Sequence, residues 1–259
     1  MLDTQFGRVI IPTRAHAILS DVLDSVVATE GLSVVRGPVG IGKTFALRRE
    51  VDRLKADGVI AVQVTSAPKI EGSIGSFLRA VLSEWGIAGG SAVQARDALA
   101  DLLFSAHPFL SGGKRCIFIV DEAQGLKPNI LEVLRGLWDE GDSARNGNSY
   151  APAFGLLLVG NDTFLNKGGK MRKAEFRPLM SRVMIDMILS RPDATEFTNL
   201  AKGLLPDDAD AQAILARFGT EAGSLRAIDK VYRLAMSFVE NGDQLLAAIG
   251  RAIKLSGGK

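Results

Sequence analysis

One run of eight residues has the types and spacing that bind a nucleotide phosphate. It fits the pattern G-x-x-x-x-G-K-[ST] and reads Gly37-Pro38-Val39-Gly40-Ile41-Gly42-Lys43-Thr44. Its glycines allow positive φ and bring backbone N–H groups close to phosphate oxygens, where a Cβ would obstruct them. Lys43 would reach the β- and γ-phosphates, and Thr44 would offer its hydroxyl to Mg²⁺. These residues favour an ATP or GTP site over a plain glycine-rich turn between a strand and a helix.

Two carboxylates, Asp121 and Glu122, directly follow the apolar run Cys116–Val120. An acidic residue at a strand end can hold Mg²⁺, and the next carboxylate can orient or deprotonate an attacking water. The alternative is that both acids only favour the N-terminus of the following helix. Because a phosphate loop is present, the sequence favours Asp121 as a metal ligand and Glu122 as the base.

Three further side chains are suited to the γ-phosphate. Asn161 ends the next apolar strand, where its amide could position water, although it could also be a turn asparagine after glycine. Arg182 and Arg226 have planar, permanently charged guanidinium groups that bind phosphate bidentately. For each arginine, a solvated helix position is an equally good interpretation.

The elements that must position these residues alternate between strands and helices. Apolar patterning predicts strands at 32–36, 59–65, 116–120 and 154–159, and helices at 15–30, 43–55, 74–85, 91–106 and 129–139. The polar, glycine-rich segment 141–152 is predicted to be a mobile loop. This order is typical of an α/β fold, a parallel sheet with helices on both sides.

Beyond Pro192 the pattern is helical only. Helices are predicted at 194–204, 209–217, 224–240 and 244–255, with no convincing strand among them. We therefore expect two domains, residues 1–191 as a nucleotide-binding α/β domain and residues 192–259 as a small all-helical lid domain.

The composition is that of a globular protein in a reducing compartment. Hydrophobic residues make up 47% and charged residues 23%, and no apolar run approaches the roughly 18 residues of a membrane helix. The single cysteine, Cys116, forms no internal disulfide and is expected to be buried. A net charge of +2 is too small to indicate nucleic acid by itself. The sequence therefore predicts a cytoplasmic protein without a membrane partner.

Taken in order, these motifs resemble those of the AAA+ ATPases. Five features carry the resemblance: the Walker A run at 37–44, the Walker B box at 121–124, Asn161 as sensor 1, Arg182 as arginine finger and Arg226 as sensor 2. Within that class the chain looks most like the MuB family, the target-DNA-selecting ATPases of Mu-like bacteriophages, and their transposon relatives. The closer match lies in residues 168–182 and 223–235.

The resemblance implies Mg-ATP as cofactor and a homo-oligomer, a ring or a helical filament, assembled on double-stranded DNA without sequence specificity. Arg182 would then act on the nucleotide of a neighbouring subunit, and Arg226 on the nucleotide of its own chain. The family delivers target DNA to a DDE transposase and activates it in DNA transposition, a form of DNA recombination. A phage-encoded protein would do so in the host cytoplasm.

DNA contacts would have to come from the ATPase domain, because only about 30 residues precede the phosphate loop, too few for the helix-turn-helix region of the Mu protein. By position in the family these contacts would include Lys69, and with weaker support Lys114 and Lys127. A second basic cluster, which could equally be a solvated loop, consists of Lys167, Lys170, Arg172 and Lys173. Contacts to phosphates would make binding salt-sensitive and largely independent of sequence.

The expected function is therefore that of an ATP-hydrolysing DNA-binding protein that selects target DNA for a transposase. Three alternatives stay open: a secretion-type AAA+ ATPase, a helicase loader, and a nucleotide-gated scaffold with little turnover. The secretion-type proteins share the Asp-Glu-Ala-Gln box but usually carry a membrane segment.

Overall fold

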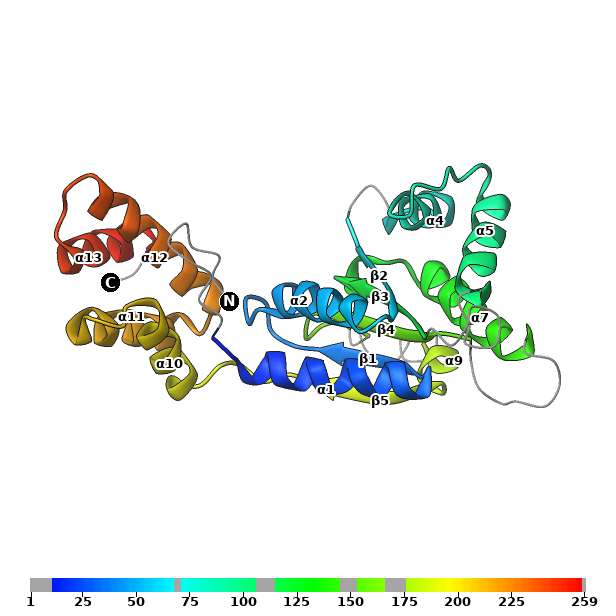
Figure 1. The fold of residues 1–259 in the computed structure, drawn as a ribbon, viewed down its shortest axis with the longest axis horizontal. Helices are drawn as coiled ribbons and strands as arrows, with labels where there is room; N and C mark the ends of the chain where they lie inside the picture. Colours follow the sequence, from blue (N-terminus) through cyan, green and yellow to red (C-terminus); the bar gives the residue numbers. More distant parts are fainter. Residues whose placement is uncertain (1–10, 68–70, 106–114, 145–152, 166–175, 258–259) are drawn as a thin grey trace. The chain divides into compact units, whose positions relative to one another are not determined.

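A parallel β-sheet forms the centre of the larger of two compact units (Figure 1). The computed structural model describes residues 11–67, 71–105, 115–144, 153–165 and 176–257. One unit contains residues 19–36 and 47–188, and the other contains residues 1–18, 37–46 and 189–259.

The sheet has five strands in the order β2-β3-β4-β1-β5, and all neighbouring strands are parallel. The strands are β1 (Leu32–Arg36), β2 (Ile60–Thr65), β3 (Cys116–Asp121), β4 (Gly155–Gly160) and β5 (Val183–Ile188). Three of them, β1, β3 and β4, are buried along their whole length, as expected of strands covered on both faces. Arg36 of β1 lies opposite Gly160 of β4, so the ends of these strands meet at one edge.

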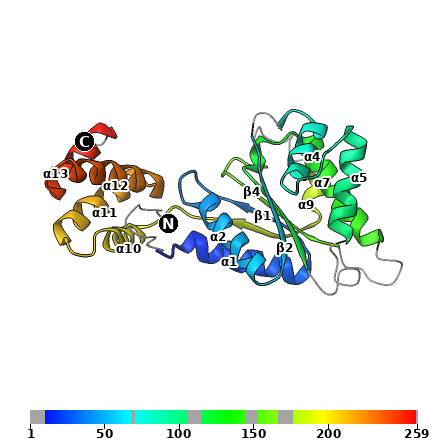
Figure 2. The same ribbon diagram turned by 45° about the horizontal axis from the view of Figure 1, so that its top comes forward.

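Helices cover both faces of the sheet. On one face, α4 (Ile74–Ser83), α5 (Ala92–Ser105) and α7 (Pro128–Ala144) pack together and share one core with Phe118 and Leu156. Figure 2 shows these three helices gathered together. Gly155 lies next to Leu156 and faces the other way, where a Cβ would lie 2.6 Å from Val26 Cγ1 of α1 (Arg14–Thr29). Helix α1 therefore packs on the opposite face.

Helix α2 (Lys43–Ala56) is tied to α1 by polar contacts. Ser20 Oγ donates to Glu50 Oε2 at 2.9 Å, and Arg53 forms an ion pair with Asp24 at 2.6 Å. Arg53 also pairs with Glu50 of its own helix, so its guanidinium links that carboxylate to Asp24 of α1.

The smaller unit is built around four consecutive helices. They are α10 (Ala194–Leu204), α11 (Ala209–Ala222), α12 (Leu225–Glu240) and α13 (Leu245–Leu255). Their apolar faces meet in one core that includes Phe197, Leu215 and Ile228. Asp193 and Asp208 cap the starts of α10 and α11, and Gly223, at φ 60°, ends α11.

These observations confirm the predicted fold class, but some local predictions were wrong or incomplete. Helix α11 ends at Ala222 rather than at the predicted Arg217. Strand β5 was not predicted, because its residues alternate between half-buried and exposed at the sheet edge and lack a continuous apolar run. Helix α7 continues to Ala144 rather than ending at Asp139, so the first residues of the predicted loop are helical. The short helix α9 (Arg177–Met180) was also missed. The predicted boundary between residues 191 and 192 stays a prediction.

Cys116 is buried, as predicted. It begins β3 and is not accessible to solvent. Burial raises the pKa of its thiol to about 12, and the nearby Glu30 carboxylate acts in the same direction. The thiol is therefore protonated at neutral pH and serves as a small core residue.

Candidate nucleotide site

The predicted phosphate loop, residues 37–42, connects the end of β1 to the start of α2. Gly40 and Gly42 have φ of 85° and 91°, values that side-chain-bearing residues rarely adopt. The ammonium of Lys43 donates to the carbonyl oxygens of Gly37 at 2.7 Å and Pro38 at 2.8 Å. Lys43 is therefore held over the loop, and Thr44 follows it in the first turn of α2. Gly40 and Gly42 thus have the positive φ expected of the motif, whereas Gly37 does not.

The phosphate loop lies against the start of α12. The backbone N–H of Arg226 donates to the carbonyl oxygen of Gly40 at 3.2 Å. A Cβ on Gly40 would lie 2.4 Å from Ser224 Oγ, so this approach requires glycine as much as the positive φ does. The structure thus brings the predicted sensor 2 arginine, whose side chain is exposed, to the phosphate loop of the same chain.

The predicted acidic residues lie at the end of β3. Asp121 is its last residue and is fully buried, and its Oδ1 accepts the backbone N–H of Glu122 at 2.9 Å. Glu122 has φ 56° and begins the turn η1 (Ala123–Gly125). Non-glycine residues with positive φ are uncommon, and those that do occur are often found at functional sites.

Asn161 follows the last residue of β4, and Gln124 connects it to Glu122. The side-chain amide of Gln124 donates through Nε2 to Glu122 Oε2 and accepts the backbone N–H of Asn161 at 2.9 Å through Oε1. The structure therefore brings the predicted base and the predicted sensor residue into one hydrogen-bonded group.

The side chain of Asn161 also stabilises its own turn. Its Oδ1 accepts from the backbone N–H of Thr163 at 3.0 Å and from Thr163 Oγ1 at 2.7 Å. The turn interpretation is thus correct for the amide oxygen. The Nδ2 group carries the two donors that a phosphate oxygen or water could accept.

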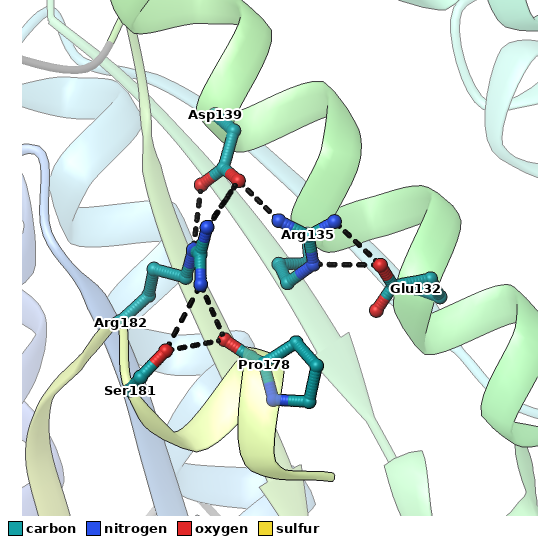
Figure 3. A network of polar contacts seen from close by, with 6 residues as sticks. All are labelled: Glu132, Arg135, Asp139, Pro178, Ser181 and Arg182. Carbon is teal, nitrogen blue, oxygen red and sulfur yellow. Dashed lines mark hydrogen bonds and ion pairs between the residues drawn. The ribbon is translucent and has the colours of Figure 1, made fainter. Parts of the chain in front are cut away.

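Arg182 lies just after α9 and is bound by a carboxylate of its own chain (Figure 3). Its Nε and Nη2 both donate to Asp139 of α7, with distances of 3.0 to 3.2 Å. Its Nη1 donates to Pro178 O at 3.0 Å and Ser181 Oγ at 2.9 Å. Arg135 approaches the same carboxylate of Asp139, and hydrogen bonding to Glu132 raises the pKa of Arg135 above its usual value. Arg182 is therefore part of a charged network rather than a solvated helix residue.

Sequence reasoning gave no role to Gln124 or Asp139. Gln124 was visible as the last residue of the Walker B box, but nothing in the sequence shows which side chain it reaches. Asp139 and Arg135 have the i,i+4 spacing of a helical ion pair, whereas the contact from Asp139 to Arg182 spans 43 residues.

Of the proposed DNA contacts, only Lys127 lies among the described residues. Its side chain is exposed and its Nζ donates to Gly72 O at 3.2 Å. Lys69, Lys114, Lys167, Lys170, Arg172 and Lys173 lie outside the described residues.

The residues expected to hold Mg²⁺ have suitable chemistry. Mg²⁺ is usually bound by one or two protein oxygens together with substrate phosphates and water. Thr44 supplies a hydroxyl and Asp121 a carboxylate. Across residues that the structure describes, no group of three or more His, Cys, Asp or Glu could hold a metal ion.

No helix within the described ranges is long and apolar enough to cross a membrane.

Several solved structures resemble this chain. The ORC2 protein of Aeropyrum pernix, in ADPNP and ADP complexes, has a TM-score of 0.66 and 18% identity over 97% of this chain and 70% of that chain. The ORC1 protein of A. pernix in complex with DNA has a TM-score of 0.66 and 17% identity over 95% of this chain and 65% of that chain. Domain III of the replication initiation protein DnaA of Thermotoga maritima has a TM-score of 0.60 and 14% identity, with 98% of each chain covered.

No curated protein sequence matched this chain. A family model described as "AAA domain" matches residues 27–162, more than half of the chain. That segment contains the phosphate loop, both acidic residues at the end of β3, and Asn161 after β4. The chain therefore belongs to the AAA domain family and is an AAA+ P-loop protein.

Proposed function

We propose that this protein is an AAA+ ATPase that hydrolyses Mg-ATP and assembles on double-stranded DNA. The observation that carries the proposal is the junction between the phosphate loop and α12, where Arg226 N–H bonds to Gly40 O. A backbone cradle and an ammonium on one loop, with an arginine on the helix that contacts this loop, suit a nucleoside triphosphate better than a singly charged ligand.

Each site residue has a proposed role in hydrolysis. Lys43 and the loop N–H groups bind the phosphates, and Glu122 takes a proton from the attacking water. Asn161 contacts the γ-phosphate through Nδ2, and Arg226 stabilises phosphate charge within its own chain. Mg²⁺, held through Thr44 and Asp121, would neutralise phosphate charge. Arg182 is proposed to act on the nucleotide of a neighbouring subunit.

The DNA partner is supported by likeness and by charge. ORC1 of A. pernix was solved in complex with DNA and has the same fold, at 17% identity. The basic positions Lys127 and those of 167–173 could contact phosphates without reading sequence. The order of motifs resembles the MuB family, and on that basis we propose that the protein delivers target DNA to a DDE transposase.

ATP turnover with and without duplex DNA tests this proposal. We expect the wild-type protein to hydrolyse ATP and to form DNA-bound oligomers visible by electron microscopy. Lys43→Ala should lose ATP binding and assembly together, because Lys43 is central to the phosphate cradle. Lys202→Ala, an exposed lysine on α10, is the matched control and should behave as wild type.

The outcome also separates the alternatives. DNA-bound assembly without measurable turnover would replace the enzyme by a nucleotide-gated scaffold. Turnover with no binding to duplex DNA would exclude the DNA-binding role. A gene for a DDE transposase beside the gene for this protein would supply the partner for a strand-transfer assay, and failure to stimulate that transposase would favour a helicase loader.

A further inference from the structure

Gln124 connects the ends of two neighbouring strands. Its side chain leaves η1, just past β3, and forms hydrogen bonds to the Glu122 carboxylate and to the backbone N–H of Asn161 at the end of β4. We propose that Gln124 is a positioning residue that fixes the Glu122 carboxylate for its reaction with water. It also links this carboxylate to the turn at residues 161–163 after β4, here called the sensor loop. The inference rests on the proposed function, in which Glu122 is the base.

The chemistry of the two partners fixes the orientation of the Gln124 amide. An ionised carboxylate only accepts hydrogen bonds, and a backbone N–H only donates. The NH₂ group must therefore face Glu122 and the carbonyl oxygen must face Asn161. A glutamate at position 124 could still accept from Asn161, but it could not donate to Glu122.

The turn that begins at Glu122 holds the side-chain amide of Gln124 in place. The N–H of Gly125 donates to Glu122 O at 3.0 Å, and that of Leu126 donates to Ala123 O at 3.1 Å. Ala123 is fully buried and anchors the turn in the core. A Cβ on Gly125 would lie 2.1 Å from Glu71 Oε1, so the turn is closely packed on its other side as well. Gln124 is thus presented by a constrained backbone.

A neutral amide is suited to this task. A general base must lie within hydrogen-bond reach of the proton that it removes. Lysine or arginine at position 124 would orient Glu122 but would also neutralise its charge. The amide restrains the carboxylate and leaves it negative. Its bond to Asn161 also means that a shift of the sensor loop changes the restraint on the base.

Two substitutions at position 124 test the proposal. Gln124→Ala removes both hydrogen bonds, whereas Gln124→Glu keeps the acceptor for Asn161 but replaces the donor to Glu122 by a second carboxylate that repels it. We expect kcat for ATP hydrolysis to fall about 10- to 100-fold in both variants, a part of what a general base contributes. The KM and the affinity for a fluorescent ATP analogue should stay within about twofold, because neither bond belongs to the phosphate loop.

A matched control and a second measurement complete the test. Gln94→Glu makes the same change on α5, where Gln94 Oε1 accepts the Ser91 N–H and a carboxylate can do the same. Its kcat should not change. Hydrogen exchange of the Asn161 amide should accelerate in Gln124→Ala and stay slow in Gln124→Glu.

The outcomes distinguish this inference from the proposed function. Wild-type kcat in Gln124→Glu, with slow turnover in Glu122→Gln, would overturn the positioning role alone. Normal turnover in Glu122→Gln would show that Glu122 is not the base. Unchanged Asn161 exchange in Gln124→Ala would overturn the bridge whether or not the protein hydrolyses ATP.

Discussion

Glu122 and Arg182 are both expected to act on the γ-phosphate, but the chain restrains them in different ways. A neutral amide, Gln124, binds the Glu122 carboxylate, which keeps its charge. Asp139, a carboxylate, binds two nitrogens of Arg182, and Pro178 O and Ser181 Oγ accept from the third. The proposed base is therefore held by a neutral group, whereas the arginine is paired with an opposite charge.

The difference indicates what each residue must do before it can react. Glu122 needs only water within reach, because its negative charge is already available. Arg182 donates five hydrogen bonds within its own chain, so a phosphate of a neighbouring subunit would have to compete with Asp139 for it. The following predictions test this contrast, from the largest expected effect to the smallest.

Substitution of the base should have the largest effect. We expect Glu122→Gln to lower kcat by about 100-fold or more, because the amide cannot accept a proton from water. ATP binding should persist, so the variant should accumulate as a DNA-bound assembly. Steady-state turnover and analogue binding measure the two effects. Glu84→Gln, an exposed position at the end of α4, is the control and should match wild type.

Loss of the arginine should have a smaller effect and one that another subunit can correct. Arg182→Ala should lower turnover about 10- to 100-fold, in keeping with the loss of one charge-stabilising group. Mixing it with Glu122→Gln should restore part of the activity, because Glu122→Gln subunits still bind ATP, assemble and supply Arg182 to a neighbouring site whose Glu122 is intact. Turnover that stays at the level of the separate variants would contradict a role in trans.

Removal of the charge on Asp139 should change stability. Asp139→Asn loses the ionic partner of both Arg135 and Arg182, which are only partly exposed, so we expect a loss of about 1 kcal/mol in the free energy of unfolding. Urea denaturation followed by tryptophan fluorescence reports on this unit, because Trp85 and Trp138 both belong to it. Asp229→Asn, which breaks a single exposed pair with Arg233 in the helical unit, should cost about 0.3–0.5 kcal/mol. That unit contains no tryptophan, so its unfolding is followed by circular dichroism. Equal losses would argue against a network.

The smallest effect is expected at Ser181. Ser181→Ala removes one neutral acceptor from the exposed Nη1 of Arg182 and leaves the bonds from Nε and Nη2 to Asp139. The free energy of unfolding should change by less than about 0.5 kcal/mol, as for most surface substitutions. A larger change in the same urea measurement would show that the hydroxyl, and not the carboxylate, is the main restraint on Arg182.

Sequence patterns predicted most of the fold because the core strands are continuously apolar. β3 and β4 are buried along their whole length, and the helices α10, α12 and α13 begin and end within one residue of their predicted limits. Helix α11 begins as predicted but ends at Ala222 rather than at Arg217. Among the five strands of the sheet only β5 was missed, since this edge strand alternates between half-buried and exposed residues and lacks a continuous apolar run. The phosphate loop was also predictable from the sequence, because all of its groups come from eight adjacent residues.

The sequence by itself determined which chemical groups stand at the strand ends: the glycines of the loop, Lys43, Thr44, Asp121, Glu122 and Asn161. Tertiary structure alone decided which distant residues contact one another. The contact of Gly40 with Arg226, of Gln124 with Asn161, and of Asp139 with Arg182 spans 37 to 186 residues. Such contacts depend on how strands and helices pack, because the periodicity of a segment sets which face it buries but not which distant side chain it meets.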